Sequence, residues 1–239
     1  MCSIGWLKLD NSWILFKNRD RKASEPKENI LIQDDDLVGF GDKKFPGLWV
    51  GINKYGIGIA TAYGPIIDVP IGLKPENFEA NEKILRKCKT VEEAKKIYLA
   101  LAKNLGRSFN VIISDSRHAI ALEIIPNDVS EEKFDMVVAK TNCFTELKRY
   151  NVNKEKTKKS EMRLRKLMEL LQGVNSGKDM IPILKFHSKT NCYENICRHA
   201  SAETVASVIF DIKDNKTYIY YLLNEFPHNK NFEEKTVSF

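Results

Sequence analysis

The pattern of apolar positions predicts β-hairpins in the first third of the chain. Apolar runs at 3–9 and 13–16 flank the polar segment Asp10-Asn11-Ser12, and runs at 48–52 and 57–62 flank a second polar segment at 53–56. Strand-like runs joined by such short polar segments are typical of hairpins. Each of these pairs is therefore expected to form two antiparallel neighbours, because a tight turn cannot join parallel strands.

Helical patterns follow in two regions of the chain. Thr90-Val91-Glu92-Glu93 matches a capping box and opens an amphipathic segment that we expect to end near Asn104, with a further helix before it at 75–88. The segment Lys158–Leu171 has a helical period, and Gly173 follows its end as a C-terminal glycine often does. A short helix is expected at 181–186.

Strand patterns return between and after these helices, at 109–114, 119–125, 136–141, 205–212 and 217–223. Lys213-Asp214-Asn215-Lys216 joins the last two as a hairpin turn. The order of elements favours an α+β fold with two antiparallel sheets and helices on their outer faces. No repeat, low-complexity linker or domain boundary is evident, so residues 1–239 are expected to form a single domain.

Composition and charge exclude several classes of function. Net charge is +6, but 38 basic and 32 acidic residues are interspersed, whereas nucleic-acid-binding proteins usually gather positive charge on one face. The densest basic run, 154–166, is expected to be a solvated helix face. No apolar run approaches the roughly 20 residues needed to cross a bilayer, and no signal peptide is evident. We therefore expect a cytoplasmic protein with reduced cysteines, no membrane contact and no nucleic-acid partner.

Cys2 is the first candidate for chemistry. Removal of Met1, which is readily trimmed before a small residue, would leave a thiol and a free α-amine on Cys2. An α-amine titrates near pH 8 and can accept the thiol proton without help from a histidine. An accidental cysteine at this position is the alternative, and the remaining motifs decide between the two.

Three further segments carry polar groups suited to a reaction at Cys2. Asp20, in Phe16-Lys17-Asn18-Arg19-Asp20, should lie beside Cys2 through the first hairpin and orient its amine or thiol, although a charged surface turn is the alternative. The strand that ends at Tyr63 can aim a backbone N–H at a reacting carbonyl, unless it is an ordinary buried strand. Asn142, in Thr141-Asn142-Cys143-Phe144, offers a neutral amide for an oxyanion, or else forms a turn.

A fourth segment, Asn195-Ile196-Cys197-Arg198-His199, contains an arginine that can hold a carboxylate. Cys192, Cys197 and His199 also suggest zinc. Their spacing matches no paired-ligand pattern and a fourth ligand is not evident, so we expect neither a metal nor a cofactor.

Taken together, these motifs resemble the acyl-coenzyme A:6-aminopenicillanic acid acyltransferase family, which is related to the choloylglycine hydrolases and penicillin V acylases within the N-terminal-nucleophile (Ntn) hydrolases. The resemblance covers nearly the whole chain. It rests on motifs in a fixed order: Cys2, Asn18-x-Asp20, Gly56-x-Gly58-x-Ala60, Thr141-Asn142-x-Phe144, Ile196-Cys197-Arg198-His199 and the final strand Ala206-Ser207-Val208-Ile209-Phe210-Asp211.

The resemblance implies a four-layered αββα sandwich and a role for each motif residue. Cys2 is implied as nucleophile, Asp20 as its orienting group, and Asn142 with the Tyr63 N–H as the oxyanion hole. Arg198 matches the late arginine of the family. Lys17 and Asn18 are expected to take part in substrate binding, and Asn18 is expected to support the residues that contact the substrate.

Two departures from related families narrow this expectation. Choloylglycine hydrolases have arginine at the position of Lys17, which makes a bile-salt-like substrate a poor expectation, because lysine cannot form the same bidentate contacts. The segment Asn18-Arg19-Asp20 also resembles the NRDE family, but Arg21 stands where that family has glutamate.

The expected activity is hydrolysis or transfer at a linear amide bond through a Cys2 thioester. The substrate is expected to be a small N-acyl amide or peptide-like molecule. A homo-oligomer is possible. Four aromatic residues are candidates for an acyl pocket or for plain core: Trp6, Trp49, Tyr63 and Phe144. The alternatives are a non-catalytic binding protein that keeps the fold, an NRDE-type protein, and a zinc module built on Cys192, Cys197 and His199.

Overall fold

Two antiparallel β-sheets form the centre of the molecule. The computed structural model describes residues 2–25, 27–65, 76–102, 108–126, 128–189, 192–199 and 202–239. The six-stranded sheet has the order β10-β1-β2-β11-β12-β13. Its strands are β1 (Ser3–Lys8), β2 (Trp13–Lys22), β10 (Val137–Lys140), β11 (Ala202–Lys213), β12 (Lys216–Leu223) and β13 (Glu233–Ser238).

The seven-stranded sheet follows the chain order from β3 to β9, so neighbouring strands are joined in sequence. Its strands are β3 (Asn29–Gln33), β4 (Leu37–Asp42), β5 (Leu48–Asn53), β6 (Gly58–Tyr63), β7 (Phe109–Ser114), β8 (Ala119–Ile125) and β9 (Asp128–Phe134). All of the pairings in both sheets are antiparallel.

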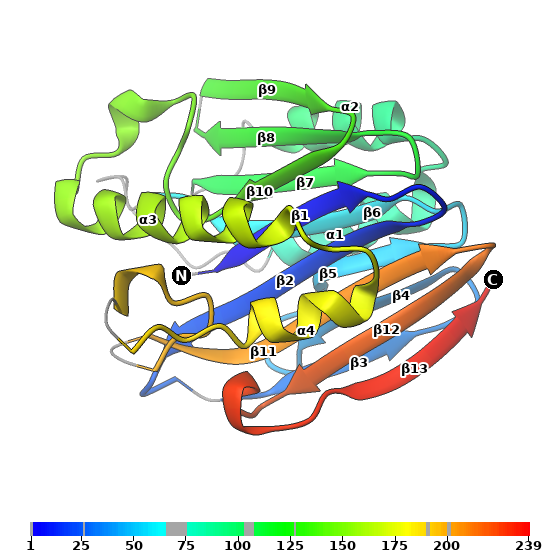
Figure 1. Ribbon diagram of the computed structural model, residues 1–239. Helices are drawn as coiled ribbons and strands as arrows, with labels where there is room; N and C mark the ends of the chain where they lie inside the picture. Colours follow the sequence, from blue (N-terminus) through cyan, green and yellow to red (C-terminus); the bar gives the residue numbers. More distant parts are fainter. Residues whose placement is uncertain are drawn as a thin grey trace.

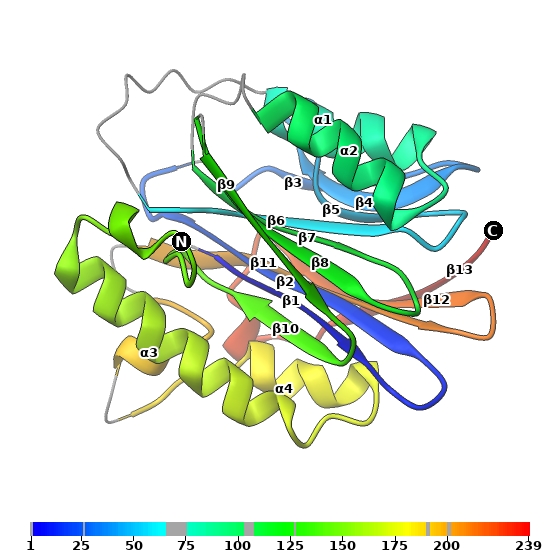
Figure 2. The same ribbon diagram turned by 90° about the horizontal axis from the view of Figure 1, so that it is seen from above.

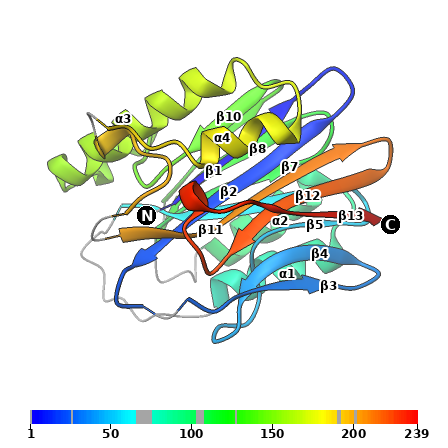
Figure 3. The same cartoon turned by 60° about the horizontal axis from the view of Figure 1, so that its bottom comes forward.

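Helices cover the outer face of each sheet, which gives four layers in the order helix, sheet, sheet, helix (Figures 1 and 2). Helices α1 (Glu76–Lys87) and α2 (Val91–Ala102) lie on the seven-stranded sheet. Helices α3 (Lys154–Leu171) and α4 (Met180–Leu184) lie on the six-stranded sheet, as Figure 3 shows from below. Short 3-10 turns complete the chain: η1 (Lys148–Tyr150), η2 (Gly177–Asp179), η3 (Cys192–Glu194) and η4 (Pro227–Asn229).

The core between the two sheets is apolar and holds the largest aromatic side chains. Trp6, Trp49, Phe40 and Phe210 are fully buried there. Burial of such side chains is worth roughly 1.5–3 kcal/mol each relative to exposure, so this layer is a main source of stability. Trp6 and Trp49 are therefore core residues, as is Phe144 in a smaller cluster, while Tyr63 is half-buried.

The sequence predicted most elements within a residue or two. β7 and β8 match the predicted ranges, and α2 begins as expected: the Glu93 N–H donates to Thr90 Oγ1 at 3.2 Å, and the Glu93 carboxylate accepts from the Lys89 N–H at 2.8 Å. The predicted end of that helix at Asn104 lies outside the described residues, as does the start of the preceding helix at Pro75. In the last hairpin, Asp214 and Asn215 take φ values of 50° and 60°, the left-handed pair that a tight two-residue turn requires.

Two differences have clear causes. β2 continues to Lys22, past the predicted end at Phe16, because its charged residues pair with β11 and lie buried instead of forming a surface turn. Four strands were not predicted from the pattern: β3, β4, β9 and β13. β9 and β13 are edge strands whose exposed positions carry charged residues, which weakens the apolar signal. Among the described residues, no helix is long and apolar enough to cross a membrane.

Candidate active site

Cys2 lies just before β1 and is buried, with 4% of its surface exposed. β1 pairs with β2 in the register Ser3↔Asn18, so Cys2 comes next to the charged part of β2. Burial alone raises the pKa of the Cys2 thiol. The Asp20 carboxylate also raises this pKa by repulsion. Three effects lower it and outweigh the other two: the positive charge of Lys17, the positive charge of the chain's amino terminus, and a hydrogen bond from the Asp20 backbone N–H. The net result is a thiol pKa below its ordinary value, which favours a nucleophilic thiolate.

A chain of hydrogen bonds joins the nitrogen of Cys2 to the end of β6. That nitrogen donates to Asn142 Oδ1 at 2.7 Å, and Asn142 Nδ2 donates to the Tyr63 carbonyl at 2.7 Å. The structure thus brings together Cys2, Asn142 and Tyr63, which lie far apart in sequence.

The backbone of Tyr63 faces the site for a reason of register. The Gly64 N–H donates to the Ser108 carbonyl at 2.9 Å, and Tyr63 pairs with Phe109 in the next position. Hydrogen-bonded and non-hydrogen-bonded pairs alternate along an antiparallel ladder, so the N–H and carbonyl of Tyr63 point away from β7. The Tyr63 carbonyl accepts from Asn142 on that side, so the Tyr63 N–H points to the same side. The expected oxyanion hole requires the N–H in this direction.

Asn142 itself is held on several sides. Its backbone N–H donates to Ser160 Oγ of α3 at 2.9 Å. Asn110 Nδ2 of β7 donates to the carbonyls of the two residues that flank Asn142, Thr141 at 2.8 Å and Cys143 at 3.2 Å. Asn110 therefore fixes the backbone of this segment from the other sheet.

A buried ion pair anchors the segment that follows Asn142. The Glu123 carboxylate accepts from Lys140 Nζ at 2.8 Å and from the backbone N–H groups of Thr145 and Leu147 at 2.6 and 2.8 Å. A carboxylate with several such donors stays ionised, and the pKa of Glu123 is lowered, with burial opposing and Lys140 favouring the charged form. Sequence reasoning did not identify Asn110, Glu123 or Lys140.

Arg163 is the most important site residue that sequence reasoning missed. It lies on α3 with 2% of its surface exposed, and its guanidinium donates to Asn142 Oδ1 at 3.0 Å. Burial lowers the pKa of Arg163 to about 10, and the charge of Asp20 raises it in part. The expectation that 154–166 forms a solvated face is wrong for this residue. The available signal was spacing, because Ser160, Arg163, Leu167 and Leu171 follow the helical period of a buried stripe.

Lys17 points into the interior from β2 and is 2% exposed. Its ammonium donates to the Thr61 carbonyl at the end of β6 and lies 5.5 Å from the Trp49 ring centre. Burial lowers the pKa of Lys17 to about 8, against the attraction of Cys2 and Asp20. A buried cation, still mostly protonated at pH 7, therefore lies beside the thiol.

Asp20 connects Cys2 with the late arginine. Its Oδ1 accepts from Thr204 Oγ1 at 2.8 Å, Thr204 Oγ1 in turn accepts from the Arg198 N–H at 2.9 Å, and the Arg198 guanidinium approaches Asp20 Oδ2 at 3.9 Å. Asp20 and Arg198 thus lie close together. Arg198 is 14% exposed by its side chain and borders the site instead of being sealed in it.

Asn18 lies beneath the site and is fully buried. Its amide nitrogen donates to the carbonyls of Leu184 and Ile196, at 3.0 and 3.1 Å, and its oxygen accepts from Ser207 Oγ at 2.5 Å. Both amide hydrogens are thus used inside the protein. This is the supporting position expected for Asn18, while its direct contact with a substrate stays a prediction.

Arg19, the residue between Asn18 and Asp20, makes a separate buried ion pair. Its guanidinium lies 2.9 Å from Asp42 Oδ2 and 5.1 Å from the Trp49 ring centre. Arg21 shares the same carboxylate, which explains how two arginines on one strand are accommodated. Arg21 therefore helps to neutralise the buried Asp42 carboxylate.

Comparison with known proteins identifies the family of the chain. The family model described as acyl-coenzyme A:6-aminopenicillanic acid acyl-transferase matches residues 6–224. No curated protein matched the sequence.

Three similar solved structures share the fold at low sequence identity. A mutant of conjugated bile acid hydrolase from Clostridium perfringens aligns with a TM-score of 0.60 and 14% identity, over 100% of this chain and 97% of that one. Penicillin V acylase from Agrobacterium tumefaciens gives 0.55 and 10%, over 99% and 90%. The Caenorhabditis elegans ortholog of N-acylethanolamine-hydrolyzing acid amidase gives 0.55 and 13%, over 87% and 92%.

These likenesses confirm the predicted fold, two antiparallel sheets between helices as in the Ntn hydrolases. The family match spans most of the chain, from β1 to the end of β12. The chain belongs to the acyl-coenzyme A:6-aminopenicillanic acid acyl-transferase family.

Proposed function

We propose that this protein cleaves or transfers the acyl group of a linear amide through a thioester on Cys2. The observation that carries the proposal is the hydrogen-bonded path from the Cys2 nitrogen through Asn142 to Tyr63, next to a thiol whose pKa is lowered. A nucleophile, a base and candidate oxyanion donors are then neighbours in one buried place. The proposal requires that Met1 be removed, because only a free α-amine can accept the thiol proton.

The first half of the proposed reaction forms the thioester. The thiol proton of Cys2 passes to the α-amine, and the sulfur attacks the amide carbonyl carbon, so that a C–S bond forms as the C=O π bond opens. The oxyanion accepts hydrogen bonds from Asn142 Nδ2 and the Tyr63 N–H, and loss of one such donor costs roughly 2.7–4 kcal/mol of transition-state stabilisation. The C–N bond then breaks, and the leaving amine takes the proton held by the α-ammonium.

The second half releases the acyl group. Water or a second amine attacks the thioester and passes a proton to the α-amine. The C–S bond then breaks, and the α-ammonium returns that proton to the sulfur, which regenerates the Cys2 thiol and the neutral α-amine. Water makes the protein an amidohydrolase, and an amine makes it an acyltransferase. Lys17 and Asp20 support both halves of the reaction. Lys17 does so by its positive charge near the thiolate, and Asp20 by the hydrogen bond from its backbone N–H to the sulfur.

The substrate class that we propose is a small N-acyl amide or peptide-like molecule. The structures that share the fold carry the names of a conjugated bile acid hydrolase, a penicillin V acylase and an acid amidase that hydrolyses N-acylethanolamines. Arg198 borders the site with part of its side chain exposed, and suits a substrate carboxylate.

Trapping the acyl-enzyme tests the proposal directly. Protein that lacks Met1 is incubated with a panel of N-acyl amides, quenched in acid and analysed by intact mass and peptide mapping. We expect an adduct of the acyl mass on Cys2, no adduct in Cys2→Ala, and much slower turnover in Cys2→Ser. Cys192→Ser is the matched control, since Cys192 is an exposed free thiol outside the site.

Two outcomes separate the proposal from its rivals. Absence of an adduct on Cys2 with every donor, in protein shown to lack Met1, contradicts the proposal and favours a non-catalytic binding protein. Retention of Met1 in protein purified from its native host favours the same rival, because the amine is then blocked. If an adduct forms, adding a panel of amines decides between hydrolysis and acyl transfer by the product that appears.

A further inference from the structure

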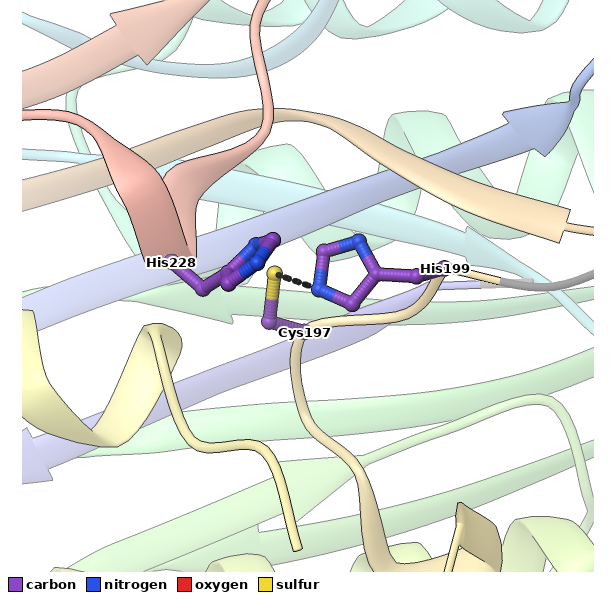
Figure 4. A group of neighbouring side chains, drawn as sticks. All are labelled: Cys197, His199 and His228. Atoms are coloured by element: carbon purple, nitrogen blue, oxygen red, sulfur yellow. Dashed lines mark hydrogen bonds between the residues drawn. The ribbon is translucent and has the colours of Figure 1, made fainter. Parts of the chain in front are cut away.

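A second group of reactive side chains lies outside the residues used at Cys2. Two of the four histidines of the chain, His199 and His228, lie close to Cys197, and the ring of a third, His187, contacts both of these histidine rings. Cys197 and His199 come from the loop before β11, and His228 from η4 between β12 and β13. Figure 4 shows the sulfur and the two imidazole rings pointing toward one another.

The distances in this group suit a metal ion. Cys197 Sγ and His199 Nε2 are 3.4 Å apart, and one ligand atom from each of Cys197, His199 and His228 lies within 4.8 Å of the others. Two atoms bound to the same tetrahedral zinc, at about 2.3 Å for sulfur and 2.0–2.1 Å for nitrogen, are about 3.5 Å apart. The cysteine and His199 thus already have the separation of two zinc ligands, and His228 needs a small movement.

The chemistry of the donor set favours a transition-metal ion. One thiolate and two imidazoles are ligands that suit zinc or copper, whereas magnesium and calcium prefer oxygen ligands, and zinc is the ion that does not change the oxidation state of the thiol. A tetrahedral ion needs a fourth ligand. The His187 ring lies 5.0 Å from that of His199 and 5.9 Å from that of His228, so its imidazole or a water molecule suits this position.

We propose that Cys197, His199 and His228 form a structural zinc site that fastens the loop before β11 to the turn before β13. Cys197 is buried and its N–H donates to the Phe186 carbonyl at 3.0 Å, so its backbone is held in place, whereas His228 is exposed on η4. Binding replaces the thiol proton by the metal ion and releases that proton to solvent.

The site has a consequence for the residues around Cys2. Arg198 lies between two of the proposed ligands in sequence, and its N–H donates to the Thr204 hydroxyl that also holds Asp20. An ion bound to Cys197 and His199 fixes the backbone on both sides of Arg198. Zinc therefore acts as a positioning element for this arginine and takes no part in bond breaking.

Metal binding by the wild-type chain is the first test. Untagged full-length protein, stripped with a chelator and desalted, is titrated with Co²⁺ and then with Zn²⁺ under reducing conditions. We expect one Co²⁺ per chain, a thiolate-to-cobalt absorption band in the near ultraviolet with the visible bands of tetrahedral Co²⁺, and displacement by Zn²⁺. We also expect Zn²⁺ to raise the melting temperature. Wild-type protein without a thiolate band would overturn the proposal.

Variants then locate the ion. Cys197→Ser should remove the thiolate band, and His228→Asn, on the exposed turn, should weaken Co²⁺ binding by at least the roughly tenfold that loss of an outer partner costs. Cys192→Ser and His118→Asn are matched controls and should bind as wild type does. Cys2→Ala is the decisive control, because an N-terminal aminothiol also binds metals. A band that survives Cys197→Ser, or disappears in Cys2→Ala, contradicts the assignment, whether or not Cys2 proves catalytic.

Discussion

The two outer helical layers are built alike and differ in what they bury. The α1–α2 interface with the seven-stranded sheet buries apolar side chains such as Ile84, Val91 and Tyr98. The α3 interface with the six-stranded sheet places Ser160 and Arg163 in the same stripe as Leu167 and Leu171. All three helices bury residues at helical spacing, but only α3 presents polar side chains of its buried face to Asn142.

This difference shows how a packing surface becomes part of a site. A buried charge is costly unless it is partnered, and Arg163 meets Asn142 Oδ1 and the charge of Asp20. The seven-stranded sheet instead contributes mostly backbone carbonyls, from Thr61 to Lys17 and from Tyr63 to Asn142. Next to Cys2 and Asn142, the six-stranded side therefore supplies the cations Lys17 and Arg163, and the seven-stranded side supplies the carbonyls that accept from Lys17 and Asn142.

Arg163→Met should have the largest effect on activity. The variant keeps the volume of the side chain but removes one of the two donors to Asn142 Oδ1, so the Asn142 amide is held less firmly and loses a neighbouring positive charge. We expect the rate of Cys2 acylation to fall on the order of 100-fold, the scale for loss of one oxyanion donor, with KM changing much less. The rate is measured by intact mass with the best donor of the panel.

Two variants on the same helix sharpen this result. Arg163→Lys should recover part of the rate, because it restores a cation, and exposed Arg165→Met should leave the rate unchanged. Equal losses in Arg163→Met and Arg165→Met, or a loss that merely follows a lower melting temperature, would falsify the positioning role.

Lys17→Met should have an intermediate effect, visible without any substrate. Lys17 is a positive charge that lowers the thiol pKa of Cys2, so its removal raises that pKa. The midpoint of the pH dependence of Cys2 alkylation by iodoacetamide should move to higher pH, and alkylation at pH 7 should slow several-fold. Peptide mapping separates Cys2 from the exposed Cys192. Lys22→Met, at the exposed end of the same strand, is the control. If the midpoint of alkylation is the same in both variants, Lys17 does not lower the thiol pKa of Cys2.

Tyr98→Phe should have the smallest effect and tests the other side of the comparison. The Tyr98 hydroxyl is buried at the α1–α2 interface without a hydrogen-bond partner among the described residues, and burial raises the pKa of Tyr98. Its removal exposes no unpaired group, so we expect stability to change by less than about 0.5 kcal/mol and acylation not at all.

Tyr150→Phe provides the contrast, because that hydroxyl donates to Asp128 Oδ2 at 3.0 Å. It should cost more stability than Tyr98→Phe, as measured by urea unfolding. A strong loss of acylation in Tyr98→Phe would show that the α1–α2 interface with the seven-stranded sheet contributes to the reaction at Cys2.

Local patterns were enough to predict most elements of the fold. β7 and β8 were predicted with correct bounds because continuous apolar runs between polar turns are unambiguous. β9 and β13 were missed because edge strands face water and carry charges, and the extension of β2 was missed because its buried residues are Lys17, Asn18, Arg19 and Asp20. Polar residues inside a strand give no apolar signal, and only their partners on other elements explain their burial.

The sequence by itself determined most of the strands and helices, several antiparallel hairpins and the motif residues that relate this chain to its family. Only the tertiary structure decided which distant groups meet: Arg163 of α3 with Asn142, the Lys17 ammonium with β6, and His228 with Cys197. The physical reason is that local patterns follow from the period of a helix or strand, whereas the partner of a buried charge or thiol depends on contacts between residues far apart in the chain.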